Sequence, residues 1–160
     1  MAPSMDFEII KPSRSFLHPQ VFLKKVPCAN NHEQNFCSQL IKRAASHQVR
    51  LHVLANSQNL QIIGFIAISA SELINSPCVT IDYLLITPEY RGVLFQELGN
   101  VKASQYLLDY VINLATQVNT DIPFRYLALQ PAHEKLLPLY SSLGFEPIDK
   151  TGWLFFKINQ

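Results

Sequence analysis

Apolar and polar positions alternate along the chain with periods that separate helices from strands. From residue 32 to residue 47, apolar side chains recur at helical spacing, at Phe36, Leu40, Ile41, Ala44 and Ala45. Residues 101–118 carry a second stripe with the same spacing, formed by Val101, Ser104, Leu107, Leu108, Val111, Ala115 and Val118. The pattern predicts two amphipathic helices, and Asn100 is a suitable N-cap for the second one.

Short apolar runs bounded by turn-forming residues predict the strands. They lie at residues 7–10, 51–55, 60–68, 79–87, 125–130, 145–148 and 153–158, and a further apolar stretch at 21–26 precedes the first helix. The run at 79–87 is almost continuously apolar apart from Asp82 and stops at Pro88. Such a run is typical of a central strand that is covered on both faces.

A third helix is predicted at residues 131–143, with Pro131 in its first turn and Gly144 as its stop. Pro138 lies inside this range, where proline costs about 3 kcal/mol unless the helix is kinked or begins again there. The order of elements, with an early helix, antiparallel strands and a later strand-helix-strand-helix-strand-strand series, is that of a mixed α/β protein.

The composition fits one globular domain that spans residues 1–160. Apolar residues make up 48% of the chain and charged residues 16%, a balance that excludes intrinsic disorder. A chain of 160 residues supports one hydrophobic core and is too short for a second domain.

The cysteines and the N-terminus indicate the compartment. Cys28, Cys37 and Cys78 form no CxxC pair and have no histidine ligands nearby, which favours free thiols in a reducing compartment and no metal site. The N-terminus lacks a basic segment leading into a long apolar run, and no stretch of about 18 apolar residues occurs. We therefore expect a cytoplasmic protein with no membrane partner.

The net charge of +1 is uninformative, but residues 1–50 carry seven Lys or Arg against three acids, and the remainder carries six against nine. The bases of the first fifty residues include Lys24, Lys25, Lys42, Arg43 and Arg50. They form no run of five or six like charges, so a solvated helix face explains them more simply than a nucleic-acid surface.

Two segments in the second half of the chain carry a family resemblance. Residues 83–92, Tyr-Leu-Leu-Ile-Thr-Pro-Glu-Tyr-Arg-Gly, and residues 130–145, which contain a tyrosine five residues before the Phe of Leu-Gly-Phe, occur in order some forty residues apart. They resemble the fourth strand with its coenzyme A loop and the last helix of the GNAT superfamily of acyl-coenzyme A N-acyltransferases. The resemblance implies an α/β fold with a mixed, mostly antiparallel central sheet of about six to seven strands flanked by helices.

The resemblance also implies acetyl-coenzyme A as the acyl donor, bound by backbone N–H groups at a helix start. Here the loop departs from the family's short glycine-rich form, because six residues separate Gly92 from Gly99. The helix start at 99–104 offers phosphate contacts; the alternative is an ordinary capped helix after a surface loop. The candidate cofactor residues are Arg91, Gly92, Gly99, Asn100, Lys102 and Ser104, together with the Leu85–Ile86 backbone at the thioester carbonyl and His133 at the pantetheine arm. His133 could equally be exposed in the first turn of its helix.

The resemblance assigns the catalytic roles as well. Tyr140 matches the tyrosine that faces the coenzyme A sulfur, and it would donate a hydrogen bond to the departing thiolate; the alternative is a ring that packs under the turn at Gly144. Many relatives place a carboxylate where this chain has Thr80, which cannot act as a base. Asp82 lies on the same face and is the candidate base, or else a structural carboxylate.

These features favour an N-acetyltransferase that transfers an acetyl group to a primary amine of a small molecule, a peptide or an aminoacyl group. A narrower variant is a toxin-type enzyme that acetylates aminoacyl-tRNA, which would make tRNA a partner. The alternative from another class is a non-catalytic GNAT-like module that binds an acyl-coenzyme A or a partner protein, favoured by the irregular loop and by Thr80. The sequence leaves open a homodimer and an antitoxin partner.

Overall fold

The computed structural model describes residues 6–73, 75–131, 134–148 and 150–158, and the chain divides into two compact units. The first unit comprises Met1–Ala67 and Tyr83–Leu108, and the second comprises Ile68–Asp82 and Asp109–Gln160. The two strands at residues 62–73 and 76–86 and the helix at residues 103–118 each belong partly to both units. One domain over residues 1–160 stays a prediction.

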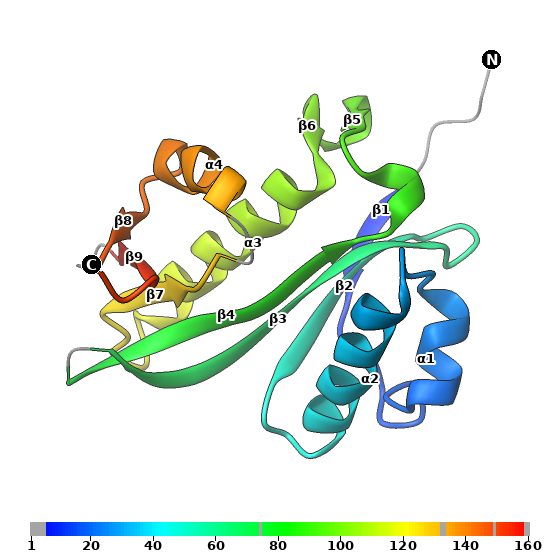
Figure 1. The fold of residues 1–160 in the computed structure, drawn as a ribbon, viewed down its shortest axis with the longest axis horizontal. Helices are drawn as coiled ribbons and strands as arrows, with labels where there is room; N and C mark the ends of the chain where they lie inside the picture. Colours follow the sequence, from blue (N-terminus) through cyan, green and yellow to red (C-terminus); the bar gives the residue numbers. More distant parts are fainter. Residues whose placement is uncertain (1–5, 74, 132–133, 149, 159–160) are drawn as a thin grey trace. The chain divides into compact units, whose positions relative to one another are not determined.

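Seven strands form one sheet in the order β1-β2-β3-β4-β7-β9-β8 (Figure 1). The strands are β1 Phe7–Ile10, β2 Arg50–Asn56, β3 Ile62–Leu73, β4 Ser76–Ile86, β7 Tyr126–Leu129, β8 Glu146–Pro147 and β9 Leu154–Lys157. The register of β4 with β7 is parallel, whereas β1 with β2, β7 with β9 and β8 with β9 are antiparallel. The predicted mixed, mostly antiparallel sheet of about six to seven strands is therefore confirmed.

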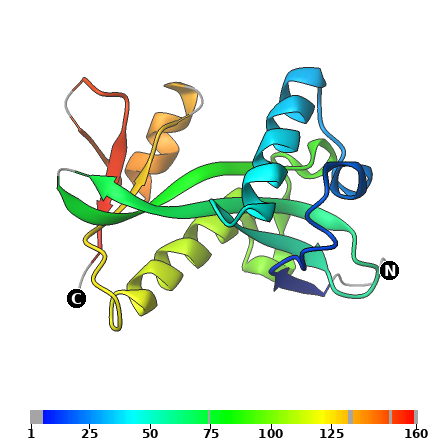
Figure 2. The same ribbon diagram turned by 90° about the horizontal axis from the view of Figure 1, so that it is seen from below.

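The helices are α1 Pro19–Lys25, α2 Asn31–Ala45, α3 Ala103–Val118 and α4 Leu137–Ser142, with short 3-10 turns η1 Pro88–Tyr90, η2 Gln96–Leu98 and η3 Glu134–Leu136. In the first unit, α1 and α2 lie on one face of β2 and β3, as Figure 2 shows. In the second unit, α4 and residues 109–118 of α3 lie on opposite faces of the strands (Figure 2). A pair of two-residue strands, β5 Leu94–Phe95 and β6 Val101–Lys102, forms a separate hairpin.

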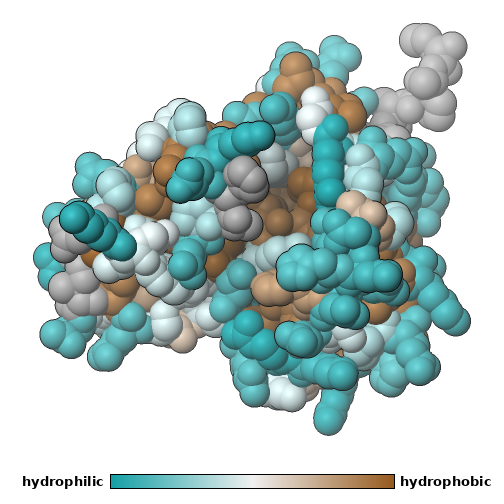
Figure 3. All heavy atoms as spheres, in the orientation of Figure 1, coloured by the Kyte–Doolittle hydropathy of each residue, from teal (hydrophilic) through white to brown (hydrophobic). Residues whose placement is uncertain are grey.

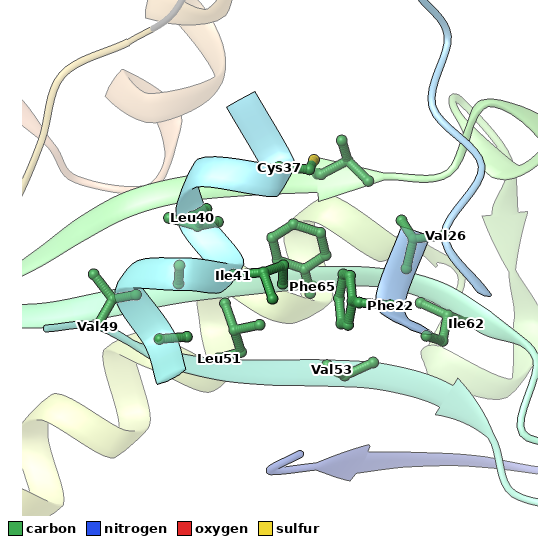
Figure 4. Packing of buried hydrophobic residues seen from close by; sticks show 13 residues of the cluster. Phe22, Val26, Cys37, Leu40, Ile41, Val49, Leu51, Val53, Ile62 and Phe65 are labelled. Carbon is green, nitrogen blue, oxygen red and sulfur yellow. The ribbon is translucent and has the colours of Figure 1, made fainter. Parts of the chain in front are cut away.

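The core of the first unit lies between α2 and the strands. Of the apolar stripe predicted for residues 32–47, Leu40, Ile41 and Ala44 are buried, together with Cys37, whereas Phe36 is 40% exposed. The predicted helix is present as α2. Figure 4 shows the buried side chains of α2 packed against residues from α1, β2 and β3, among them Phe22, Leu51, Val53 and Phe65. Phe22 and Phe65 meet edge to face with ring centroids 5.6 Å apart. The outer sides of α1 and α2 are covered by hydrophilic side chains (Figure 3).

Two boundaries differ from the predicted ones. The helix expected at residues 101–118 begins at Ala103, because Val101 and Lys102 pair with β5. Asn100 has φ 63° in the turn before β6, so the prediction that it caps the helix is wrong. The helix expected at residues 131–143 consists of η3 and then α4, in which Pro138 occupies the first turn, so this proline costs no internal hydrogen bond.

Candidate active site

The carboxyl end of β4, where the thioester is expected, lies very close to β3. A Cβ built on Gly64 would lie 2.6 Å from the Leu85 carbonyl oxygen and 2.7 Å from Ile86 Cδ1. Real Cβ atoms do not approach a backbone oxygen so closely, so only glycine allows β3 and β4 to come together here. Gly64 therefore permits the close approach of the Leu85–Ile86 backbone to β3.

Hydrogen bonds define the direction of the Ile86 backbone. The Thr87 N–H donates to the Ile63 carbonyl over 3.0 Å, and the Leu85 oxygen also points to β3. Because successive residues of a strand present their backbone groups to opposite edges, the Ile86 N–H and carbonyl point to the edge away from β3. The parallel ladder of β4 with β7 ends at Ile81, opposite Leu129. The Ile86 N–H thus points to the edge of β4 away from β3.

The Ile86 carbonyl, on the same edge, accepts a hydrogen bond from Arg91 Nε over 2.7 Å. The other end of the guanidinium, Nη2, forms an ion pair with Glu33 Oε1 at 2.6 Å. Glu33 Oε1 also accepts the N–H of Ala29, the residue before the N-cap, and the Glu33 N–H donates to the N-cap side chain at Asn30 Oδ1, so both residues cap the start of α2. Arg91, predicted to bind the cofactor, therefore connects the end of β4 to the start of α2.

An aromatic pair lies next to this contact in the first unit. Phe36 of α2 packs against Tyr83 of β4 with ring centroids 4.4 Å apart and the ring planes tilted by 39°, although Phe36 is 40% exposed. Burial, followed by the nearby Cys37 and Glu33, raises the pKa of Tyr83 to about 12, so its hydroxyl stays protonated at neutral pH. Cys28 and Cys37 lie close by with their sulfurs 3.9 Å apart, and all three cysteines are free thiols.

The predicted phosphate loop is a hairpin rather than a simple helix start. Gly92, Gly99 and Asn100 all have positive φ, and a Cβ on either glycine would meet nothing within 4 Å. The Gly99 N–H donates to the Gln96 carbonyl and the Asn100 N–H to the Phe95 carbonyl, so the hairpin itself uses these two donors. Lys102 is exposed just before α3, and Ser104 lies in its first turn.

Tyr140 lies in the second unit, and its side chain is only 7% exposed. Its ring meets Phe145 edge to face at 5.9 Å, and its carbonyl accepts the Leu143 and Phe145 N–H groups. Desolvation raises the pKa of Tyr140, which keeps the hydroxyl protonated and makes it a hydrogen-bond donor rather than a base. The Tyr140 ring packs against the turn at Gly144, as one of the two sequence-based interpretations expected. Because this packing involves the ring, it is compatible with a hydroxyl that donates a hydrogen bond.

Asp82 and Thr80 share one face of β4 in the second unit. Asp82 is half-buried, with its Oδ2 atom fully buried. Thr80, which the resemblance aligned with the family's carboxylate, is buried, and its hydroxyl is hydrogen-bonded to Ser71 Oγ beside the Cys78 sulfur. Thr80 is thus already engaged by its neighbours, and Asp82 is the acid that this face of the strand presents.

One predicted site residue lies outside the described ranges, and the hollow in the second unit involves none of the others. His133 is outside the described residues. A surface hollow of 610 Å³ in the second unit, lined by Pro77, Asn119, Phe124, Arg125, Lys157 and others, contains none of the predicted site residues. Among the described ranges, no group of three or more His, Cys, Asp or Glu could hold a metal ion. Nor does any described helix combine the length and apolar character that crossing a membrane requires.

Sequence reasoning missed Glu33 and Gly64. The sequence Asn-Asn-His-Glu at residues 30–33 has the spacing of a capping box, so the cap could have been found, but the contact of Glu33 with Arg91 joins residues 58 apart. Gly64 looks like any glycine within an apolar strand, a position that often marks a close approach of backbones.

Comparisons with known proteins relate this fold to solved structures. No protein-family model matches the chain, and no curated protein matches it either. The structure of AtaTR bound with AcCoA is similar over 96% of this chain and 94% of that one, with a TM-score of 0.76 and 21% identity. AtaT complexed with acetyl-methionyl-tRNAfMet matches over 95% of each chain, with a TM-score of 0.75 and 18% identity.

A tyrosine-to-phenylalanine variant of KacT is also similar, over 95% of each chain, with a TM-score of 0.73 and 17% identity. These neighbours have the GNAT fold, and the likeness extends over nearly the whole chain. At such low identity the likeness is one of architecture. The fold that the motifs at residues 83–92 and 130–145 implied is therefore confirmed.

Proposed function

We propose that this protein is an N-acetyltransferase that uses acetyl-coenzyme A to acetylate the α-amine of an aminoacyl-tRNA. The observation that carries the proposal is the likeness, over about 95% of the chain, to AtaT in complex with acetyl-methionyl-tRNAfMet. The similar structure of AtaTR bound with AcCoA supports the same acyl donor here. The proposal includes a cytoplasmic location, because aminoacyl-tRNA occurs in the cytoplasm.

The residues of the chain supply the groups that the reaction requires. Acetyl-coenzyme A, when bound, supplies an activated acetyl group; a C–N bond forms, the C–S bond breaks, and the amine loses one proton. The Ile86 N–H points away from β3 and would stabilise the charge that develops on the thioester oxygen. The protonated Tyr140 hydroxyl would donate to the thiolate, and Asp82 would accept the proton of the amine.

The nature of the amine follows from proton energetics. Only a neutral amine attacks a thioester, and an α-amine with a pKa near 8 is neutralised at pH 7 for about 1.4 kcal/mol. A lysine side chain needs about 4.6 kcal/mol by the same reasoning. Since Thr80 replaces the family's carboxylate and its hydroxyl is already bonded to Ser71, a substrate that is easily deprotonated suits this site.

Basic side chains of the first unit support an RNA partner. Lys24 and Lys25 lie in the last turn of α1, and Lys42 and Arg43 in the last turn of α2, all of them exposed. Arg14 and Arg50 line a small hollow of 80 Å³ together with His47. Phosphate backbones bind such exposed cations without reading sequence. The proposal uses these bases as phosphate contacts, where the sequence alone favoured a solvated face.

A transfer experiment tests the proposal. The protein is incubated with acetyl-coenzyme A carrying a radiolabelled acetyl group and with bulk aminoacyl-tRNA, deacylated tRNA, free amino acids or a lysine-containing peptide. The proposal predicts label on the aminoacyl-tRNA only, released with the amino acid as an N-acetyl derivative by mild alkali. Label on the peptide or on the free amino acids would assign another acceptor. Binding of acetyl-coenzyme A without transfer to any pool would favour the non-catalytic module.

A further inference from the structure

The guanidinium of Arg91 makes two directed contacts within the first unit. Nε donates to the Ile86 carbonyl at 2.7 Å, and Nη2 contacts Glu33 Oε1 at 2.6 Å. Glu33 is itself fixed, because the same oxygen accepts the Ala29 N–H at 3.1 Å and its N–H donates to Asn30 Oδ1 at 2.8 Å. Charge-assisted hydrogen bonds of this length are the strong ones in proteins.

These contacts determine the orientation of one peptide plane. The plane between Ile86 and Thr87 carries the Ile86 carbonyl, held by Arg91, and the Thr87 N–H, held by the Ile63 carbonyl at 3.0 Å. A planar peptide unit that is hydrogen-bonded at both ends is held in one orientation by these two bonds. The adjoining plane, which carries the Ile86 N–H, has its carbonyl oxygen against Gly64. The direction of the Ile86 N–H is thus restricted on both sides.

The same contacts make Arg91 a poor phosphate ligand. Its charge is compensated by Glu33, whose side chain is only 15% exposed, and a pyrophosphate at the guanidinium would face the Glu33 carboxylate. Like charges at such a distance repel, and release of Arg91 would leave a mostly buried carboxylate without its cation. The pair is therefore better suited to holding the protein backbone than to binding an anion.

We propose that Arg91 and Glu33 act together as a positioning pair that holds the carboxyl end of β4 against α2, so that the Ile86 N–H points at the thioester oxygen. The inference rests on the proposed acetyl transfer and assigns Arg91 to turnover rather than to coenzyme binding. It also connects the start of α2, through Glu33, to the reacting edge of β4.

The test compares Arg91→Gln, Arg91→Lys, Glu33→Gln and the double variant Arg91→Gln/Glu33→Gln. Coenzyme A release from acetyl-coenzyme A with bulk aminoacyl-tRNA gives kcat and KM, and calorimetry gives the Kd of acetyl-coenzyme A. Each single variant should lower kcat about tenfold, as expected for loss of a charge-assisted hydrogen bond, while the Kd changes less than about threefold. Arg91→Lys should behave like Arg91→Gln, because one ammonium cannot replace the planar fork. Arg125→Gln removes an exposed arginine of the second unit and serves as control.

The double variant separates the two roles of Arg91. If the two residues form a positioning pair, the kcat of the double variant should lie within about twofold of the kcat of either single variant, because both changes break the same connection. A phosphate ligand predicts instead that Arg91→Gln weakens acetyl-coenzyme A binding tenfold or more while Glu33→Gln keeps full kcat. That result, or independent effects of the two changes on kcat, overturns the inference.

A second readout keeps the failure of this inference distinct from failure of the proposed function. In protein labelled with 15N-isoleucine, Arg91→Gln and Glu33→Gln should shift the same Ile86 amide signal in the same direction. If the wild-type protein neither binds nor consumes acetyl-coenzyme A, the proposed function is wrong, and this shift still decides whether the pair holds Ile86. An unchanged Ile86 signal in both variants refutes the positioning pair even in an active enzyme.

Discussion

Gly64 and the Leu85 carbonyl oxygen lie so close that a methyl group on Gly64 would meet this oxygen at 2.6 Å. The contact joins β3 to the part of β4 where the acetyl group is expected to be transferred. Neither Gly64 nor Leu85 has a side chain with a functional group that would mark it as a catalytic candidate. This close contact of two backbones limits, from the β3 side, the position of the β4 residues where transfer is proposed.

Gly64→Ala should impair both stability and turnover. The added Cβ must displace the Leu85 oxygen and Ile86 Cδ1, and such overpacking costs about 1–3 kcal/mol of unfolding free energy. Because the displaced residues carry the proposed oxyanion donor, kcat should fall by a larger factor than the loss of folded protein alone would cause. Urea unfolding and coenzyme A release measure the two effects. Gly152→Ala, at φ 83° with only an ordinary contact at 3.5 Å, is the control for stability loss alone. If folded Gly64→Ala protein had the same kcat as wild type, the contact would have no role in catalysis.

Tyr140→Phe tests the thiolate donor. The ring packs on Phe145 and is retained by phenylalanine, so the variant should fold and bind acetyl-coenzyme A within a few-fold of wild type. Turnover at neutral pH should fall about 100-fold, and the loss should shrink for acyl donors with a more acidic thiol. Tyr126→Phe, which removes the hydroxyl of another half-buried tyrosine, is the control. Full activity of Tyr140→Phe would assign the ring to packing only.

Asp82→Asn tests the candidate base. If Asp82 accepts the proton of the amine, the variant should bind acetyl-coenzyme A normally and lose about 100-fold or more in kcat. Asp109→Asn, an exposed acid in α3 of the same unit, should keep wild-type kcat. A large drop in melting temperature with unchanged kcat would instead identify Asp82 as a structural carboxylate.

His52 should make the fold sensitive to acid. Burial lowers the pKa of this histidine to about 4, with Lys11 and Arg50 adding to the effect, and its side chain is 3% exposed. Because the unfolded chain takes up the proton near pH 6.5 and the folded chain only near pH 4, stability is complete above pH 6.5 and declines as pH falls to 4. The decline from this group should amount to about 3 kcal/mol.

Urea unfolding of wild type and His52→Gln at pH 7, 5.5 and 4 measures that effect. The difference between the two proteins should change by about 3 kcal/mol across the window, since glutamine does not titrate. Parallel pH profiles of the two proteins would show that another group causes any acid sensitivity.

The sequence predicted the fold where its signals were local and periodic. The stripe Phe36, Leu40, Ile41 and Ala44 specified α2. The stretch at residues 21–26 is too short to show a period, and its helix depends on Pro19 in the first turn and on His18 Nδ1, which accepts the Gln20 N–H. Asn100 failed as a cap because the β5–β6 hairpin extends to Lys102, so that α3 begins only at Ala103.

The candidate site was predictable only in its motifs. Residues 83–92 and 130–145 pointed to Ile86, Arg91 and Tyr140, because the spacing of these two segments resembles that of the GNAT superfamily. The direction of a backbone N–H leaves no mark in a sequence, and neither does the contact of Arg91 with a residue 58 positions away. The roles given to Lys102, Ser104 and His133, and a homodimer, stay predictions.

Titration of the protein with acetyl-coenzyme A tests the central claim most directly, since every proposed role depends on this donor. Calorimetry should show saturable binding at one site, and ligand at one hundred times its Kd should stabilise the fold by about 2.7 kcal/mol. For a chain of 160 residues this corresponds to a rise in melting temperature of about 5–10 °C. Desulfo-coenzyme A and free adenosine diphosphate serve as ligand controls. Heat of dilution only, with no thermal shift at millimolar ligand, would contradict the account.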